Sequence, residues 1–161
     1  DPLLNCRMPG GRNPVRIICD SKLRTPFDSN IVKTAGEVPT IIATVSEDKE
    51  LIEKYTDKNI TVIQTSDDNG HVDLNELMIK LGEMKIDGIL LEGGGELNFS
   101  ALKAGIVNKI ECYIAPKIFG GTEAKSPVGG IGVDVPDEAF VFGKPDVSFF
   151  DDDILLEWRL K

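Results

Sequence analysis

A run of glycines that follows a short apolar stretch is the part of this chain best suited to chemistry, and it occupies residues 87–96. Glycine has no Cβ atom, so its backbone N–H group can approach an anion closely and its φ angle can become positive. A helix that starts at about Glu96 points its partly positive N-terminus at the same place. The pattern predicts a turn that holds a phosphate, with Glu92 at the tip of a strand beside it. The alternative is a tight strand-to-helix turn that needs glycine only for steric reasons.

Five segments, residues 1–7, 13–21, 90–95, 113–121 and 127–132, resemble a known family. Their residues, their order and their approximate spacing are similar to those of the reductase domain of the bacterial bifunctional riboflavin-biosynthesis deaminase/reductase. Linked motifs that extend over nearly the whole chain do not easily match by accident. The chain is therefore identified as a member of that family.

The resemblance implies an α/β fold of the dihydrofolate-reductase-like kind, with a mostly parallel sheet flanked by helices and antiparallel C-terminal strands. It also implies NADPH as the cofactor. The expected reaction reduces the ribosyl group of 5-amino-6-(5-phosphoribosylamino)uracil to a ribityl group in riboflavin biosynthesis. The expected substrate is thus a phosphoribosylamino-pyrimidine.

Three residues match positions at which the family contacts this substrate. Arg7 matches an arginine that binds the 5′-phosphate, for which a guanidinium group is well suited. Leu4 matches a position on the same segment, and Glu92 matches a glutamate at the carboxyl end of a strand, where α/β proteins bind ligands. Without the resemblance, Arg7 is a solvated arginine, Leu4 a core residue and Glu92 a carboxylate that caps the glycine turn.

Hydride transfer from a nicotinamide requires close and fixed positioning of donor and acceptor more than acid–base groups. The resemblance accordingly implies cofactor-binding residues, whereas the sequence assigns no catalytic acid or base. Ser21 lies near the cofactor by resemblance, although a serine at this place is also typical of a turn or a helix cap. The other expected cofactor contacts form one continuous segment: Gly94, Gly95, Glu96, Leu97, Asn98, Phe99 and Ser100. Arg12, Arg16 and Lys22 are further candidates for phosphate contacts, without an assigned role.

The composition of the 161 residues is that of a globular domain, with 41% hydrophobic and 28% charged residues. With 18 basic and 27 acidic side chains the net charge is −9, which argues against nucleic acid as a partner. No apolar run approaches the roughly 18 residues that a membrane-spanning helix needs. We therefore expect a cytoplasmic protein that binds its anionic ligands through local positive groups.

The three cysteines, Cys6, Cys19 and Cys112, are odd in number and far apart, which fits neither a disulfide framework nor a zinc site. Free thiols and no bound metal are expected. The family's zinc deaminase domain carries a His-x-Glu and a Pro-Cys-x-x-Cys signature, and neither occurs in this sequence. We expect that deaminase domain as a covalently linked or separate partner.

Residue patterns predict alternating strands and helices over the first two thirds of the chain, which favours a parallel sheet. A helix capped by Ser46 and a helix with a capping box of Asp73 and Glu76 are expected, followed by a helix closed by Gly105. The predicted strands comprise residues 15–19, 38–45, 60–65, 88–92 and 110–115. Three further strands, at 139–142, 147–150 and 154–160, have no helix between them and are expected to pair antiparallel.

The sequence starts inside the family's Asp-Asp-Pro motif, so we expect residues 1–161 to be an N-terminally truncated reductase domain that is weakly active or inactive alone. A related reductase that acts on the 2,5-diamino-pyrimidinone form of the substrate is an alternative. A second alternative, outside enzymes, is a fragment that only binds the cofactor or dimerises. By analogy with the family we expect a homo-oligomer, with the C-terminal strands as one possible interface.

Overall fold

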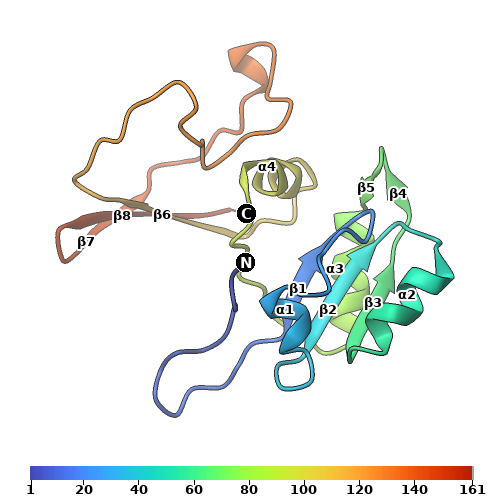
Figure 1. The fold of residues 1–161 in the computed structure, drawn as a ribbon. Helices are drawn as coiled ribbons and strands as arrows, with labels where there is room; N and C mark the ends of the chain where they lie inside the picture. The colour runs from blue at the N-terminus through green and yellow to red at the C-terminus, as the bar shows by residue number, and fades with distance from the viewer. Residues whose placement is uncertain (161) are drawn as a thin grey trace. The chain divides into compact units, whose positions relative to one another are not determined.

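The structure is a computed structural model that describes residues 1–160. The chain divides into two compact units, residues 1–87 and residues 88 onward. Each unit has its own sheet and its own helices, as Figure 1 shows. The predicted functional residues are consequently shared between the two units, with Leu4, Arg7 and Ser21 in the first and the glycine-rich segment in the second.

The first unit is built on a parallel sheet of three strands, β1 (Arg16–Cys19), β2 (Thr40–Thr44) and β3 (Ile60–Gln64). Strand β2 lies between the other two, with Ile42 opposite Ile18 on one side and Val62 on the other. All five residues of β2 are buried, which explains why this segment is an almost continuous apolar run. The three strands and their parallel pairing were predicted correctly.

Three helices accompany this sheet: α1 (Asn30–Lys33), α2 (Lys49–Thr56) and α3 (Leu74–Glu83). Helix α2 begins later than predicted because Asp48, not Ser46, is its N-cap. The Asp48 carboxylate accepts a hydrogen bond from the backbone N–H of Leu51 at 3.0 Å. Both residue types are good N-caps, so local sequence did not decide between them.

Helix α3 follows a short hairpin, β4 (Asp67–Asp68) and β5 (His71–Val72), and buries the leucines expected from their helical spacing. Asp73 is the N-cap, as predicted, and its carboxylate accepts from the backbone N–H of Glu76 at 3.0 Å. The capping box is incomplete, however, because the Glu76 carboxylate accepts no hydrogen bond from the backbone N–H of Asp73, which donates to the Ser66 carbonyl instead.

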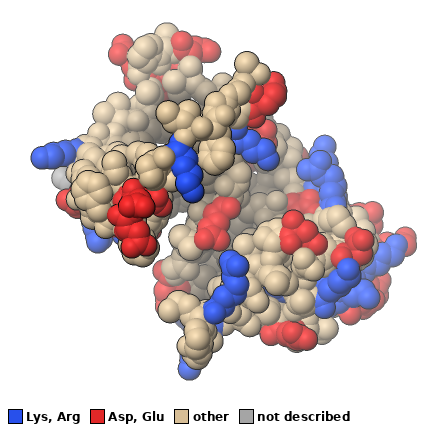
Figure 2. Space-filling model, turned by 60° about the vertical axis from the view of Figure 1, so that its left-hand side comes forward, with Lys and Arg blue, Asp and Glu red and all other residues tan. Residues whose placement is uncertain are grey.

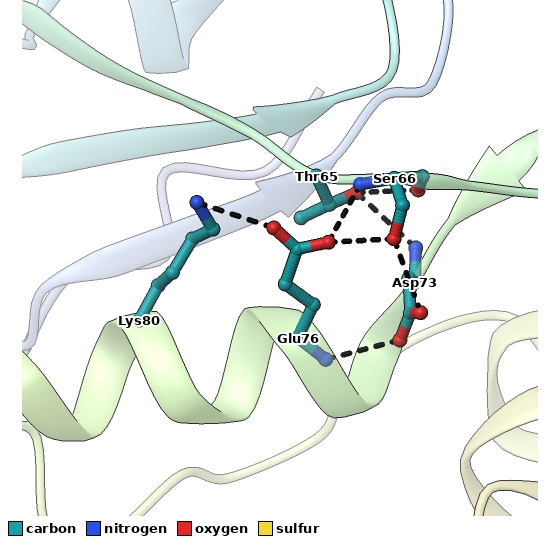
Figure 3. A network of polar contacts seen from close by, with 5 residues as sticks. All are labelled: Thr65, Ser66, Asp73, Glu76 and Lys80. Atoms are coloured by element: carbon teal, nitrogen blue, oxygen red, sulfur yellow. Dashed lines mark hydrogen bonds and ion pairs between the residues drawn. The ribbon is translucent and has the colours of Figure 1, made fainter.

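The Glu76 carboxylate instead binds Ser66, accepting from its backbone N–H at 2.7 Å and from its hydroxyl at 2.6 Å (Figure 3). Lys80, one turn later on α3, forms an ion pair with Glu76 at 3.2 Å. These hydrogen bonds from Ser66 are the main cause that lowers the pKa of Glu76 from 4.5 to about 2, and Lys80 contributes further. Glu76 therefore fastens the end of β3 to the first turn of α3.

The second unit contains helix α4 (Gly95–Lys103) and an antiparallel sheet of β6 (Lys109–Ile114), β7 (Asp146–Phe150) and β8 (Asp153–Arg159). Strand β8 lies in the middle and pairs with both others. A long connection with one short 3₁₀ helix, η1 (Pro136–Glu138), links β6 to β7. The predicted strands at 110–115, 147–150 and 154–160 are confirmed, and the last two pair antiparallel as expected. Strand β6 was expected in the parallel part of the sheet, but it pairs antiparallel with β8.

Two predicted strands are wrong: neither residues 88–92 nor residues 139–142 belong to a strand of this structure. The apolar residues of the first segment are exposed, Leu90 at 78%. β-Propensity reports how well a residue suits a pleated, half-buried surface, and a strand also needs a hydrogen-bonded neighbour. Neither segment has such a neighbour among residues 1–160, so the apolar pattern alone did not make a strand.

Candidate functional site

The N-terminus of helix α4 lies where the glycine pattern predicts a phosphate site, and that role stays a prediction. Gly94 is the N-cap, and no side chain of the described residues caps the helix. The first backbone N–H groups of an α-helix have no partner inside the helix. At α4 these are the groups of Gly95, Glu96 and Leu97, which together with the helix dipole form a site of the kind that binds phosphate.

Close contacts, and not positive φ angles, explain two of the three glycines, which is the steric reason considered as the alternative. None of Gly93, Gly94 and Gly95 has a positive φ, and Gly94 has φ −72° and ψ 168°. At Gly95, a Cβ atom would lie 2.7 Å from the backbone nitrogen of Gly129. At Gly93 it would lie 2.7 Å from a methyl carbon of Leu97. Gly93 and Gly95 lack a side chain because other atoms approach them closely.

Residues 126–130 form the wall on which the first turn of α4 rests. The N–H of Gly129 donates to the carbonyl of Gly95 at 3.0 Å, and the Asn98 side-chain amide donates to the carbonyl of Pro127 at 2.8 Å. Gly130 has φ +76°, and a Cβ atom there would lie 2.8 Å from the ring of Phe99. Two of the sequence motifs that carried the resemblance, 90–95 and 127–132, are thus in direct contact.

The side chains of the predicted cofactor segment serve mainly to hold the helix. Phe99 is 8% exposed and packs edge to face on Phe140, with ring centroids 5.7 Å apart. Asn98 is tied to the wall, and the Ser100 hydroxyl donates to the carbonyl of Glu96 at 3.0 Å. The groups of this segment left to contact an anion are the backbone N–H groups at its start rather than these side chains.

Glu92 precedes this turn and is exposed, with no hydrogen bond or ion pair to any other described residue. It does not cap the glycine turn, which was the alternative role considered for it. Its carboxylate is free to accept hydrogen bonds from hydroxyl or amino groups of a ligand.

Leu4 and Arg7 lie on an irregular segment before β1. Leu4 is half-buried with φ +45°, a conformation that is unfavourable for a residue with a Cβ atom. Arg7 is exposed, and its guanidinium has no partner among residues 1–160. The segment is held by Asp1, whose carboxylate accepts from the backbone N–H of Asn30 at 2.9 Å, and by Asn13, whose side-chain oxygen accepts from the N–H of Cys6 at 3.0 Å.

Ser21 follows the carboxyl end of β1, as expected for a residue near a ligand in an α/β fold. Its hydroxyl oxygen accepts from the N–H of Val72 at 3.2 Å, and its carbonyl accepts from the Thr44 hydroxyl at 3.0 Å. The hydroxyl proton is left to be donated, so Ser21 can still bind a phosphate or a ribose oxygen.

The loop after Ser21 is fixed by Asp20, which is buried. Thr25 donates to the Asp20 carboxylate from both its N–H and its hydroxyl, each at 2.7 Å. Burial alone raises the pKa of Asp20, but hydrogen bonds from the Arg24 and Lys22 backbones and from Thr25 outweigh it and lower that pKa below its ordinary value. Asp20 is thus a charged anchor of the turn that carries Ser21.

Arg16 is buried, whereas the sequence analysis listed it as a candidate for a phosphate contact. It is 1% exposed and all its hydrogen-bonding groups are used within the first unit. The signal for burial was its place in the predicted strand 15–19, where every neighbour is apolar.

Comparison with known proteins decides the family. The sequence model described as the RibD C-terminal domain matches residues 1–147, which is most of the chain. The chain belongs to the RibD C-terminal domain family. The expected family assignment is thus confirmed.

Named relatives agree with this family. The chain is 50% identical over 158 residues to the riboflavin biosynthesis protein RibD of Actinobacillus pleuropneumoniae, covering 98% of this chain and 42% of that protein. It is 34% identical over 154 residues to the 2,5-diamino-6-ribosylamino-4(3H)-pyrimidinone 5′-phosphate reductase of Methanothermobacter thermautotrophicus, covering 94% and 68% respectively. The chain thus spans less than half the length of the RibD protein that it matches.

Solved structures of RibD proteins share the fold. RibD of Acinetobacter baumannii superposes with a TM-score of 0.75 at 20% identity, over 99% of this chain and 41% of that one. A deaminase/5-amino-6-(5-phosphoribosylamino)uracil reductase of Thermotoga maritima gives a TM-score of 0.72 at 25% identity, over 98% and 41%. The expected fold class, a dihydrofolate-reductase-like α/β domain with antiparallel C-terminal strands, is confirmed.

A hollow of about 340 Å³ lined by Phe27, Lys54, Asp57 and Lys58 contains none of the predicted residues. On the face shown in Figure 2, basic and acidic side chains are interspersed and form no continuous basic surface. Among residues 1–160 no group of three side chains is placed to hold a metal ion. No helix of this part of the chain has the length and apolar character to cross a membrane.

Proposed function

We propose that this domain reduces the ribosyl group of 5-amino-6-(5-phosphoribosylamino)uracil to a ribityl group with NADPH, as a step of riboflavin biosynthesis in the cytoplasm. The observation that carries the proposal is the uncapped N-terminus of α4, beside an unpaired Glu92, in a chain with relatives that are named as reductases of ribosylamino-pyrimidines. The rest of the protein is expected to include a linked deaminase domain, because the Thermotoga maritima relative is named as both a deaminase and a reductase.

The residues present fit a phosphate-bearing dinucleotide. The N–H groups at the start of α4 are suited to a pyrophosphate, and the hydroxyl proton of Ser21 is suited to an oxygen of such a ligand. When bound, NADPH would supply the hydride that forms the new C–H bond at C1′, while the C1′–O4′ bond of the ribosyl ring breaks and one proton from solvent ends on the 4′-hydroxyl. The protein residues named here bind and orient, which is the main requirement of hydride transfer.

Arg7 and Glu92 are assigned to the polar groups of the substrate. Arg7 offers an unpaired guanidinium, which binds a phosphate through two parallel hydrogen bonds. Glu92 offers an unpaired carboxylate, which accepts hydrogen bonds from ribose hydroxyls or pyrimidine amino groups. Leu4 contributes apolar contact next to Arg7.

Two substitutions in the intact protein test these roles. Arg7→Ala is expected to raise KM for the phosphoribosylamino substrate at least tenfold, equivalent to about 1.4 kcal/mol of binding, with the NADPH Kd unchanged. Glu92→Gln is expected to weaken substrate binding far more than NADPH binding. Arg24→Ala is the matched control, because Arg24 is an exposed arginine of the same unit and is not a candidate for a phosphate contact. Equal losses of substrate and NADPH affinity in Arg7→Ala and Glu92→Gln would contradict the assignment.

The 34% identity to an archaeal pyrimidinone reductase favours a second candidate, reduction of the 2,5-diamino-pyrimidinone substrate. The two candidates differ in the group at position 2 of the pyrimidine. Parallel assays of NADPH oxidation with both substrates decide between them, since the true substrate is expected to give the higher kcat/KM.

The antiparallel sheet supports a proposal about assembly. Strand β7 is exposed along its whole length, and Val147, Phe149 and Phe150 on it are 57%, 76% and 65% exposed. Exposed apolar patches of this kind mark interaction surfaces. We propose that the domain forms a homo-oligomer through this sheet, and light scattering of the intact protein checks the proposal.

A further inference from the structure

Arg16 is a buried cation without an anionic partner. A charge inside a protein is costly unless hydrogen bonds or an opposite charge compensate it. Among residues 1–160 no carboxylate pairs with Arg16. Burial correspondingly lowers the pKa of the guanidinium below its ordinary value. Because burial of this charge costs free energy, we expect Arg16 to have a role besides packing.

Neutral oxygen atoms satisfy every part of the guanidinium. Nη2 donates to the carbonyls of Ile31 and Val38 at 3.0 and 3.1 Å, and both Nε and Nη2 donate to the Thr40 hydroxyl, at 3.0 and 2.6 Å. Nη1 donates to the Thr34 hydroxyl at 2.8 Å and to the carbonyl of Leu3 at 3.1 Å. The side chain therefore joins the end of α1 and the start of β2 to the N-terminal segment.

The contact with Leu3 is the one that reaches the predicted substrate segment. Leu3 directly precedes Leu4, whose φ of +45° is the unfavourable left-handed conformation. Such a conformation costs about 1–2 kcal/mol for a residue with a Cβ atom and persists only where its surroundings hold it. The bond from Arg16 fixes the carbonyl on one side of Leu4. Asp1, bound to Asn30 by its carboxylate and its carbonyl, fixes the start of the segment.

We propose that Arg16 is a positioning residue of the substrate site, because its buried guanidinium holds the backbone that presents Leu4 and Arg7. This inference rests on the proposed function, in which those two residues contact the substrate. Arg16 itself touches no ligand. Its effect is transmitted through the Leu3 carbonyl, so it acts on substrate binding and leaves the cofactor segment in the second unit unaffected.

The test is Arg16→Lys in the intact protein, with steady-state kinetics for both ligands. A lysine ammonium has three donors at one point and cannot serve acceptors spread over a planar guanidinium fork. Substrate KM is expected to rise about tenfold, with the NADPH Kd unchanged. The control is Thr34→Val, which removes one acceptor of Arg16 but leaves the Leu3 contact, and it is expected to lower Tm without changing substrate KM.

Asn30→Ala covers the case in which Arg16→Lys does not fold. Asn30 donates to Asp1 from its side chain, so the variant loosens the same segment from its other end without touching the buried guanidinium. A raised substrate KM, together with faster amide exchange in residues 3–7, is expected. Unchanged substrate KM in Arg16→Lys, or in Asn30→Ala if the former is unfolded, would overturn the inference.

These results separate the inference from the proposed function. If Arg7→Ala raises substrate KM and Arg16→Lys does not, the proposed function stands and the role of Arg16 fails. If neither Arg7→Ala nor Arg16→Lys changes substrate KM, the substrate assignment of the segment fails and the positioning role fails with it.

Discussion

Substitution of Gly95 by alanine tests whether close contact, and not backbone freedom, explains the glycine run. The added Cβ atom would lie 2.7 Å from the nitrogen of Gly129 and 3.0 Å from the carbonyl oxygen of Ser126. Ordinary contacts begin at 3.4 Å, so residues 126–130 must move by 0.7 Å, the difference between 3.4 and 2.7 Å. The hydrogen bond from Gly129 to the Gly95 carbonyl, now 3.0 Å, cannot survive such a shift intact.

The energetic cost follows from these contacts. Overpacking of this kind costs about 1–3 kcal/mol and the hydrogen bond contributes about 1 kcal/mol. Alanine gains up to about 1 kcal/mol over glycine in a helix, which offsets part of the loss. We therefore expect Gly95→Ala to destabilise the protein by about 1–3 kcal/mol, with Tm falling about 2–4 °C per kcal/mol.

Gly94→Ala is the matched control, because a Cβ atom at Gly94 meets nothing within 4 Å and φ is −72°. Alanine is a weaker N-cap than glycine, so a loss below about 1 kcal/mol is expected. The assay is thermal unfolding, followed by titration with NADPH, whose affinity is expected to fall at least tenfold in Gly95→Ala as the wall withdraws from α4. Equal Tm values and equal NADPH affinities for the two variants would refute the reasoning.

Two further predictions concern stability. Tyr55 is 1% exposed and its hydroxyl donates to the carbonyls of Leu23 and Thr25 at 3.2 and 2.5 Å, so Tyr55→Phe is expected to cost about 1–2 kcal/mol, measured by urea unfolding. A variant as stable as the parent would show that these carbonyls find other donors. For Glu76, hydrogen bonds from Ser66 lower the folded-state pKa from 4.5 to about 2. Its stabilising effect relative to Glu76→Gln is thus expected to be complete above about pH 4.5 and to disappear as the pH falls towards 2. Unfolding free energies of both proteins across this range check the sign, and a difference that does not vary with pH would contradict it.

The elements with buried apolar side chains, such as β2 and α3, were predictable from the residue pattern alone. β2 is apolar because a central parallel strand is covered on both faces, and the leucines of α3 recur at helical spacing because one face is buried. Gly105 ends α4 with φ +69°, which few other residues adopt, so the end of this helix was also determined locally. The family resemblance rested on the same kind of local, linear information.

Tertiary structure decided the features that depend on a partner elsewhere in the chain. Residues 88–92 have the composition of a strand but no hydrogen-bonded neighbour among residues 1–160, and the choice of Asp48 over Ser46 as a cap depends on geometry that composition does not encode. Gly95 at the start of α4 is explained by residues 126–130, which approach from a distant part of the sequence. The role of Arg16 likewise exists only once α1, β2 and the N-terminal segment bring their oxygen atoms to one point, because a charge can be buried only where the fold supplies its partners.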